Sequence, residues 1–223
     1  RGKGGLNTQA MQPDPSRSSK TPALHGAALA VLAALLFGLS TPLIQRLGVG
    51  LGAFSTAALL YAGAAVVGAL MRQSATREAR LRRTDLGRLV MLAVAGALIG
   101  PVALAWGLQR TSGTSASLML TLEAVFTAVL AWRLYGETMD RRVAAAMTLL
   151  LGGGVALVLD QHAAGTVGVA GLLAVLLATA AWGLDNALSR PLAERDPGQV
   201  VLGKALLGGA AAAVLAVWRG EPA

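Results

Sequence analysis

Seven runs of apolar residues, each long enough to cross a lipid bilayer, constrain this chain more than any other feature of its sequence. A hydrocarbon core about 30 Å thick requires about 20 mostly apolar residues per spanning helix. The runs are rich in Ala, Leu and Gly and lack the alternating polarity of a transmembrane barrel. They lie near residues 24–45, 52–71, 86–108, 112–135, 143–159, 167–189 and 200–218. The sequence therefore predicts an all-α fold, a polytopic membrane helix bundle of about seven transmembrane helices.

Of the 19 Lys and Arg residues, all but Lys204 lie in or next to the connections between these runs, and they are distributed unevenly among them. Four precede the first run, six lie at positions 72–88, three lie where the fourth run meets the fifth, and two lie between the sixth and seventh. The alternate connections carry only Arg46, Arg110 and Arg219. The positive-inside rule then predicts a multi-pass protein of the cell (inner or plasma) membrane with a cytoplasmic N-terminus. The net charge of +8 therefore does not indicate a nucleic-acid partner, because no basic face interleaved with aromatic residues is present.

The first 23 residues are polar and include Pro13 and Pro15, so residues 1–23 are expected to form a disordered cytoplasmic tail. The first apolar run is too long for a cleaved signal peptide, and Gln45 and Arg46 follow it instead of a small-residue cleavage site. The chain begins at Arg1 and not at Met. An incomplete or processed N-terminus is therefore expected.

The chain contains an internal repeat. The segment FGLSTPLIQRL, which starts at Phe37, aligns with WGLDNALSRPL, which starts at Trp182, and Gly38 coincides with Gly183. An odd number of predicted helices separates the two copies, so they run in opposite directions, as in inverted-topology transporters. We interpret residues 24–160 as a first complete repeat of five helices and residues 161–223 as a partial second repeat of two helices.

Several motifs together resemble one family of transporters. They are the (F/W)G opening of each repeat, the LEAVFTAVLAW stretch at 122–132 and the YGETMDRR turn at 135–142. With the five-plus-five inverted design, these motifs resemble the EamA family of the drug/metabolite transporter superfamily. The resemblance implies ten helices in two five-helix repeats, cytoplasmic termini, and export or import of amino acids, sugars and other metabolites. Against that pattern the second repeat stops after its second helix, so a chain truncated after helix seven is expected.

Three ionisable residues lie well inside the predicted spans, away from their ends. An ionised carboxylate such as that of Glu123, in the fourth run, costs about 2.5–3.5 kcal/mol at mid-membrane on insertion scales. It is predicted to bind a cationic or amine group or to carry a coupling proton, or else to be a protonated carboxyl bonded to a neighbouring helix. Asp185 and Lys204, in the sixth and seventh runs, lie at similar depth. They predict an ion pair that fixes helix register or acts as a gate, with Asn186 lining a cavity beside it.

A second polar patch lies in the first run and consists of Ser40, Thr41 and Gln45. Thr41 and Gln45 share one face of a helix, because they are four residues apart. The inverted repeat places this patch opposite the one around Asp185. The two patches are therefore predicted to flank a central substrate or proton pathway.

Two prolines and one tryptophan complete the set of candidate residues. Pro42 and Pro101 weaken helical hydrogen bonding, so they are predicted to be hinges for a rocking motion, or else static kinks. Trp106 lies toward the outer end of the third run. It is predicted to stack on substrate or to anchor the helix at the membrane interface.

The residues disfavour catalysis and bound cofactors. The chain has no cysteine, His25 and His162 are isolated, and no Ser-His or Asp-Asp pair lies at a shared depth, so no enzyme activity, metal or cofactor is expected. The leading hypothesis is a transporter, or a fragment of one, for small metabolites or drugs, which works by alternating access and is driven by protons or by the substrate gradient. Its partners are the lipid bilayer and a small-molecule substrate, and oligomer formation is left open. The alternative is a non-transporting membrane scaffold or interaction protein, which the three intramembrane charges disfavour.

Overall fold

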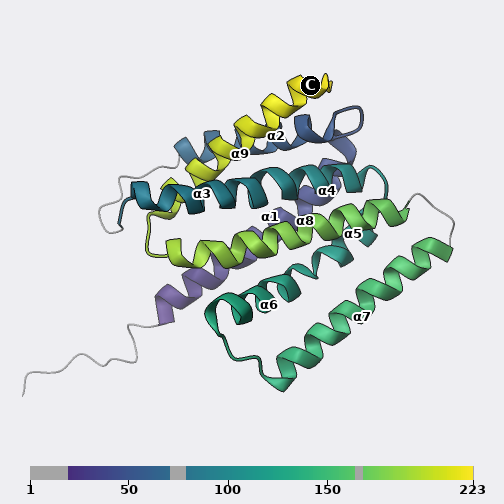
Figure 1. Ribbon diagram of the computed structural model, residues 1–223, viewed down its shortest axis with the longest axis horizontal. Helices are drawn as coiled ribbons and strands as arrows, with labels where there is room; N and C mark the ends of the chain where they lie inside the picture. Colours follow the sequence, from purple (N-terminus) through teal and green to yellow (C-terminus); the bar gives the residue numbers. More distant parts are fainter. Residues whose placement is uncertain (1–19, 71–78, 164–167, 223) are drawn as a thin grey trace, which may run out of the picture. The chain divides into compact units, whose positions relative to one another are not determined.

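The computed structural model describes residues 20–70, 79–163 and 168–222 (Figure 1). Most of the predicted tail, together with the side chains of His25 and His162, lies outside the described residues. The chain divides into two compact units, Arg1–Ser40 and Thr41–Ala223. The first unit includes α1 (Lys20–Leu47) as far as Ser40, and the second includes the rest of α1 and every other element.

Seven helical spans among the described residues are long and apolar enough to cross a membrane. This confirms the predicted polytopic helix bundle. The spans are Gly26–Leu47, Ala53–Leu70, Arg83–Leu108, Gly113–Tyr135, Arg141–Asp160, Gly168–Leu192 and Pro197–Arg219. Their bounds agree with the predicted runs to within a few residues. In the described ranges the β-pairing amounts to one isolated bridge, between Ala79 and Arg195.

The third span changes its helical register halfway along. It consists of a 3₁₀ turn, Arg83–Asp85, then α3 (Leu86–Leu92), a π-helix (Ala93–Ile99) and α4 (Gly100–Leu108). In the π-helix the N–H of Gly100 donates to the carbonyl of Ala95, five residues back. The next donor in this register would be the N–H of Pro101, which proline lacks. The carbonyl of Gly96 therefore receives no hydrogen bond from Pro101. It is available to side chains of other helices.

The fourth span contains a tight turn within a run that the sequence predicted as one segment. Helix α5 (Gly113–Leu120) ends, and α6 (Glu123–Tyr135) begins after two residues. Those residues, Thr121 and Leu122, have ψ angles of −21° and −10°, and their N–H groups donate three residues back, as in a 3₁₀ turn. Glu123 is consequently the first residue of α6, in the interior of the span.

The remaining helices have clear end signals. Helix α2 (Ala53–Leu70) precedes the third span, and α7 (Arg141–Ala163) follows α6 after Gly136, whose φ is +66°. Helix α8 (Gly168–Ser189) continues into a 3₁₀ turn that ends at Leu192. Asp196 caps α9 (Pro197–Arg219) by accepting the N–H of Gly198 at 2.8 Å.

Helix α8 lies at the centre of the second unit and packs against α4, α6 and the π-helix, while α2 packs along α9 (Figure 1). The core consists of buried apolar residues from α4, α5, α6 and α8, among them Leu108, Met119, Leu172 and Val175. Helix α7 makes fewer contacts, and none of its spanning residues is buried within the protein. Most of the surface of α7 is therefore available to lipid.

Small residues let the central helices approach one another closely. A Cβ atom on Gly183 of α8 would lie 2.6 Å from Cβ of Phe126 in α6. A Cβ atom on Gly208 of α9 would overlap Ala97 of the π-helix. Such contacts between helix backbones are typical of membrane proteins. They bring the polar side chains of α6, α8 and α9 within hydrogen-bonding reach.

Candidate functional site

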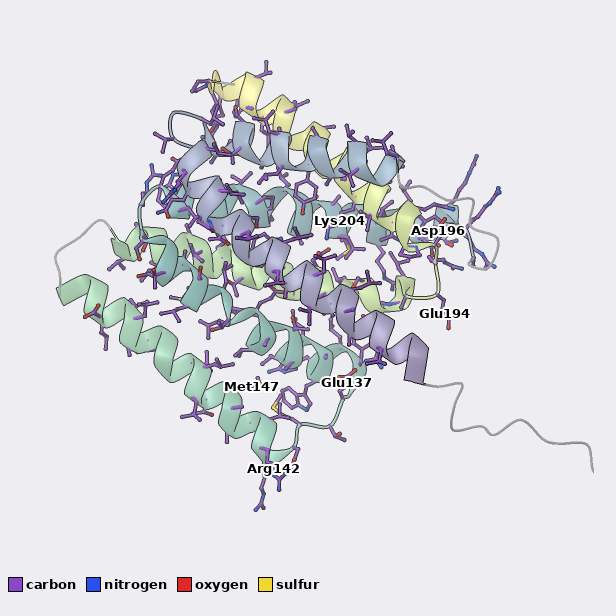
Figure 2. The ribbon with its side chains drawn as sticks, turned by 180° about the vertical axis from the view of Figure 1, so that it is seen from behind. Glu137, Arg142, Met147, Glu194, Asp196 and Lys204 are labelled. Carbon is purple, nitrogen blue, oxygen red and sulfur yellow. The ribbon has the colours of Figure 1, made fainter. Side chains whose placement is uncertain are left out.

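A buried ion pair joins α8 to α9. Lys204 donates to Oδ2 of Asp185, and the two side chains are 21% and 10% exposed. The ion pair predicted from the sequence is therefore confirmed. Figure 2 shows Lys204 part-way along α9, whereas Asp196 lies at the start of that helix. The second carboxylate oxygen, Oδ1 of Asp185, is buried and has no hydrogen-bond partner among the described residues.

The residue next to Asp185 joins α8 to α6. Nδ2 of Asn186 donates to Oε1 of Glu123 at 2.6 Å. Glu123 is half-buried and lies within electrostatic range of both Asp185 and Lys204. Two consecutive residues of α8 therefore hold partners on two different helices.

A third contact joins α2 and α8 to the π-helix. The hydroxyl of Tyr61 donates to the carbonyl of Gly96 at 2.6 Å, and Nε1 of Trp182 donates to the same oxygen at 3.0 Å. This is the carbonyl to which Pro101 has no N–H to donate. A Cβ atom on Gly96 would overlap the carboxyl group of Asp185, so that group lies directly against the π-helix.

These contacts form one group, which we name the central polar cluster. Its members are the carbonyl of Gly96 and the side chains of Tyr61, Glu123, Trp182, Asp185, Asn186 and Lys204. Two carboxylates and one ammonium give the cluster a net charge of −1 when all three are ionised. Burying such groups in a membrane costs free energy. Ionisable residues within membrane spans are therefore candidates for a functional site. Chemically, the cluster can hold a cation or exchange a proton.

Tyr61 and Trp182 were not among the residues predicted for a site. Trp182 is the aromatic residue that opens the second predicted repeat, and Tyr61 is the one tyrosine in the second apolar run. Each had a signal in the sequence. Their common partner is a backbone carbonyl, which no side-chain pattern indicates.

Gln45 of the first polar patch supports a turn. Its Nε2 donates to the carbonyls of Leu108 and Thr111, at 3.2 and 3.1 Å, and so holds the connection after α4. Thr41 is buried, and the hydroxyl of Ser40 donates to the carbonyl of Phe37 within the first unit. A role for these three residues in a substrate pathway stays a prediction.

Trp106 lies at a different place from the central polar cluster. The guanidinium of Arg110 lies 3.7 Å from the centroid of its ring. Trp106 lines a pocket of about 560 Å³ together with Phe54, Arg219 and Glu221, and no member of the cluster lines that pocket. Stacking of Trp106 on a substrate therefore stays a prediction.

The two prolines occupy different surroundings. Pro101 is buried at the start of α4, directly after the π-helix. Pro42 lies inside α1, one residue beyond the boundary between the two compact units. Both positions interrupt helical hydrogen bonding, and their role as hinges stays a prediction.

Hydrogen bonds also tie together two connections at the arginine-rich end of the second unit. We name this set the basic-end clasp; its members are Ala79, Leu81, Asp85, Arg195, Asp196 and Gln199. Nε of Arg195 donates to Asp85 at 2.9 Å, and the N–H of Asp196 donates to the carbonyl of Ala79 at 3.0 Å. Oε1 of Gln199 accepts the N–H of Leu81 at 3.1 Å. The clasp joins the start of the third span to the connection between α8 and α9.

Spanning helices around a buried charged cluster are the features of a multi-pass membrane protein. The EamA-like transporter family matches residues 24–159, which is more than half of the chain, so the chain belongs to this family. This is a family of membrane transporters and not of enzymes. Within the described residues, no group of three or more His, Cys, Asp or Glu side chains is arranged to hold a metal ion.

One relative is an uncharacterized transporter of Methanothermobacter thermautotrophicus. It is 30% identical over 121 residues, which is 53% of this chain and 35% of that protein. The match thus spans about a third of the relative's length. No solved structure matches the chain.

Proposed function

We propose that this protein moves small metabolites or drugs across the inner or plasma membrane by alternating access, with the central polar cluster as its substrate and proton pathway. One observation carries the proposal. Asp185 and Asn186, adjacent on α8, bind Lys204 of α9 and Glu123 of α6. Ionisable residues that meet within membrane spans usually mark substrate, ion or proton pathways.

The helix arrangement supports alternating access between two inverted repeats, the first at 24–160 and the second at 161–223. Helices α2 and α9, which correspond in the predicted repeat, pack side by side. The first span ends at Leu47 and the sixth at Leu192, and these two residues are aligned in the repeat. Rocking of one repeat against the other, with Pro42 and Pro101 as hinges, would expose the cluster to each side in turn.

Glu123 is the residue proposed to carry the coupling proton. The charges of Asp185 and Lys204 act on Glu123, and Asn186 donates a hydrogen bond to it. Because Lys204 pairs with Asp185, Glu123 is left without a cationic partner among the described residues. A proton or a bound substrate would neutralise it in alternation. With the arginine-rich end in the cytoplasm, the proton gradient across the membrane would drive this exchange.

The test uses the full chain reconstituted in liposomes of phosphatidylethanolamine and phosphatidylglycerol. Uptake of a panel of radiolabelled metabolites is measured with and without an imposed pH gradient. We expect Glu123→Gln to abolish the response to the gradient, because glutamine keeps the bond to Asn186 but takes up no proton. Glu194→Gln, in an exposed connection, is the matched control and should respond as the wild type does.

Two results would contradict the proposal. A gradient response unchanged in Glu123→Gln would remove the proton role of Glu123. Absence of flux for every solute, with protein shown to be folded and inserted, would favour the membrane scaffold instead.

A further inference from the structure

Each donor group of the central polar cluster already makes a hydrogen bond within the cluster. Tyr61 and Trp182 donate to Gly96, Asn186 donates to Glu123, and Lys204 donates to Asp185. A carboxylate or a phosphate would have to share Lys204 with Asp185, or Asn186 with Glu123, and would so lie beside another carboxylate. The site is therefore poorly suited to an anion.

The acceptors of the cluster, in contrast, have spare capacity. A carboxylate offers about four acceptor positions. Oδ1 of Asp185 is buried without a partner in the described part of the chain, although that residue is only 7% exposed. Glu123 accepts the bond from Asn186 at Oε1. A ligand rich in donors would use these positions.

Charge favours the same kind of ligand. The Asp185–Lys204 pair is neutral overall, so the net charge of −1 belongs to Glu123. A monovalent cation would neutralise the cluster, whereas an anion would bring it to −2 in a low-dielectric region. The rings of Tyr61 and Trp182, which meet at Gly96 beside Asp185, can also contact a cation favourably.

We infer that the central polar cluster binds a protonated organic amine that carries no carboxylate of its own. The ammonium group donates to Glu123 and to Oδ1 of Asp185, and one proton leaves Glu123 for each monovalent amine that binds. The exchange is therefore electroneutral. The transport half of this inference rests on the proposed function, while the binding half does not.

The test compares ligands that differ by a single carboxylate. Tyramine and tyrosine form one pair, and phenethylamine and phenylalanine form another. Binding to the purified full chain in detergent is measured by isothermal titration calorimetry. We expect each amine to bind at least tenfold more tightly than its amino acid. Equal or tighter binding of the amino acids would overturn the inference.

Variants then assign the selectivity to the cluster. Glu123→Gln should weaken tyramine binding at least tenfold, while Glu123→Asp, which keeps the charge, should restore most of the preference over tyrosine. Glu194→Gln is the control for a carboxylate outside the membrane and should bind tyramine as the wild type does. If Glu123→Gln does not fold, Glu123→Asp and the wild-type ligand pairs still test whether the cluster selects amines. Loss of the preference for the amine in Glu123→Asp would contradict the inference.

Flux measurements separate this inference from the proposed function. Tyramine uptake that is driven by a pH gradient and insensitive to an imposed membrane potential supports both the amine selectivity and the proposed transport function. Uptake of tyrosine in preference to tyramine leaves the transporter proposal standing and overturns the amine selectivity. Tight tyramine binding without any flux keeps the binding site and contradicts the transport role.

Discussion

At the scale of single residues, Gly96 is the position where a missing side chain matters most for the site. A methyl group there would overlap the carboxyl group of Asp185. We expect Gly96→Ala to lower the free energy of unfolding by about 1–3 kcal/mol, as overpacking does in tight cores. The displaced Asp185 should also bind Lys204 less well. Thermal unfolding in detergent and tyramine affinity measure the two effects.

Gly152→Ala provides the matched control for this substitution. Gly152 is exposed on α7, and nothing would lie within 4 Å of a Cβ atom there. Alanine in a helix is favoured over glycine by about 0.5–1 kcal/mol, so this variant should be as stable as the wild type or slightly more stable. Equal stability of the two variants would show that Gly96 does not need to be glycine.

The residues of the site were predictable to different degrees. Charged residues in apolar runs stand out, so Glu123, Asp185 and Lys204 could be identified as candidates from the sequence alone. Gly96 could not, because it is one of 28 glycines and its role depends on helices distant in the chain. The turn-supporting bonds of Gln45 likewise join residues more than 60 positions apart, which no local pattern indicates.

At the scale of helices, the π-helix and Pro101 together determine where the carbonyl of Gly96 bonds. Pro101→Ala supplies an N–H that competes with Tyr61 and Trp182 for this carbonyl. We expect the indole of Trp182 to lose its bond and its fluorescence emission to shift to shorter wavelength. The measurement uses protein in which the other three of the four tryptophans are replaced by phenylalanine.

Pro191→Ala is the control, because Pro191 is exposed in the 3₁₀ turn that follows α8. It should leave the emission of Trp182 unchanged. The same wavelength in Pro101→Ala and in the wild type would mean that the missing N–H of Pro101 does not determine the bond.

Helix positions and helix interruptions also differ in how far the sequence predicts them. Hydropathy located all seven spans closely, since membrane thickness fixes the length of each apolar run. It did not predict the π-helix at Ala93–Ile99 or the tight turn at 121–122. Both consist of residues that also fit an ordinary helix, so their register depends on contacts with other helices, which are α2, α8 and α9 for the π-helix and α7 and α8 for the helices beside the turn.

At the scale of the whole molecule, the arginine distribution predicts an orientation in the membrane, and this prediction is directly testable. The chain has no cysteine, so single introduced cysteines can be labelled without background. On intact cells, a membrane-impermeant maleimide should label Val49→Cys but not Thr138→Cys, because the arginine-rich end is expected in the cytoplasm. Thr138→Cys should react after the cells are permeabilised. The reverse pattern would contradict the predicted topology.

The basic-end clasp should open whenever the proposed site faces the cytoplasm, because the clasp holds two connections together at that end. Ala79 and Arg195 are paired in its isolated bridge, and adjacent extended segments lie close enough for a disulfide. We expect the double variant Ala79→Cys, Arg195→Cys to lose solute flux in liposomes when oxidised and to regain it on reduction. Each single variant should be indifferent to oxidation. Oxidised protein that transports at the rate of reduced protein would show that the clasp stays closed throughout transport.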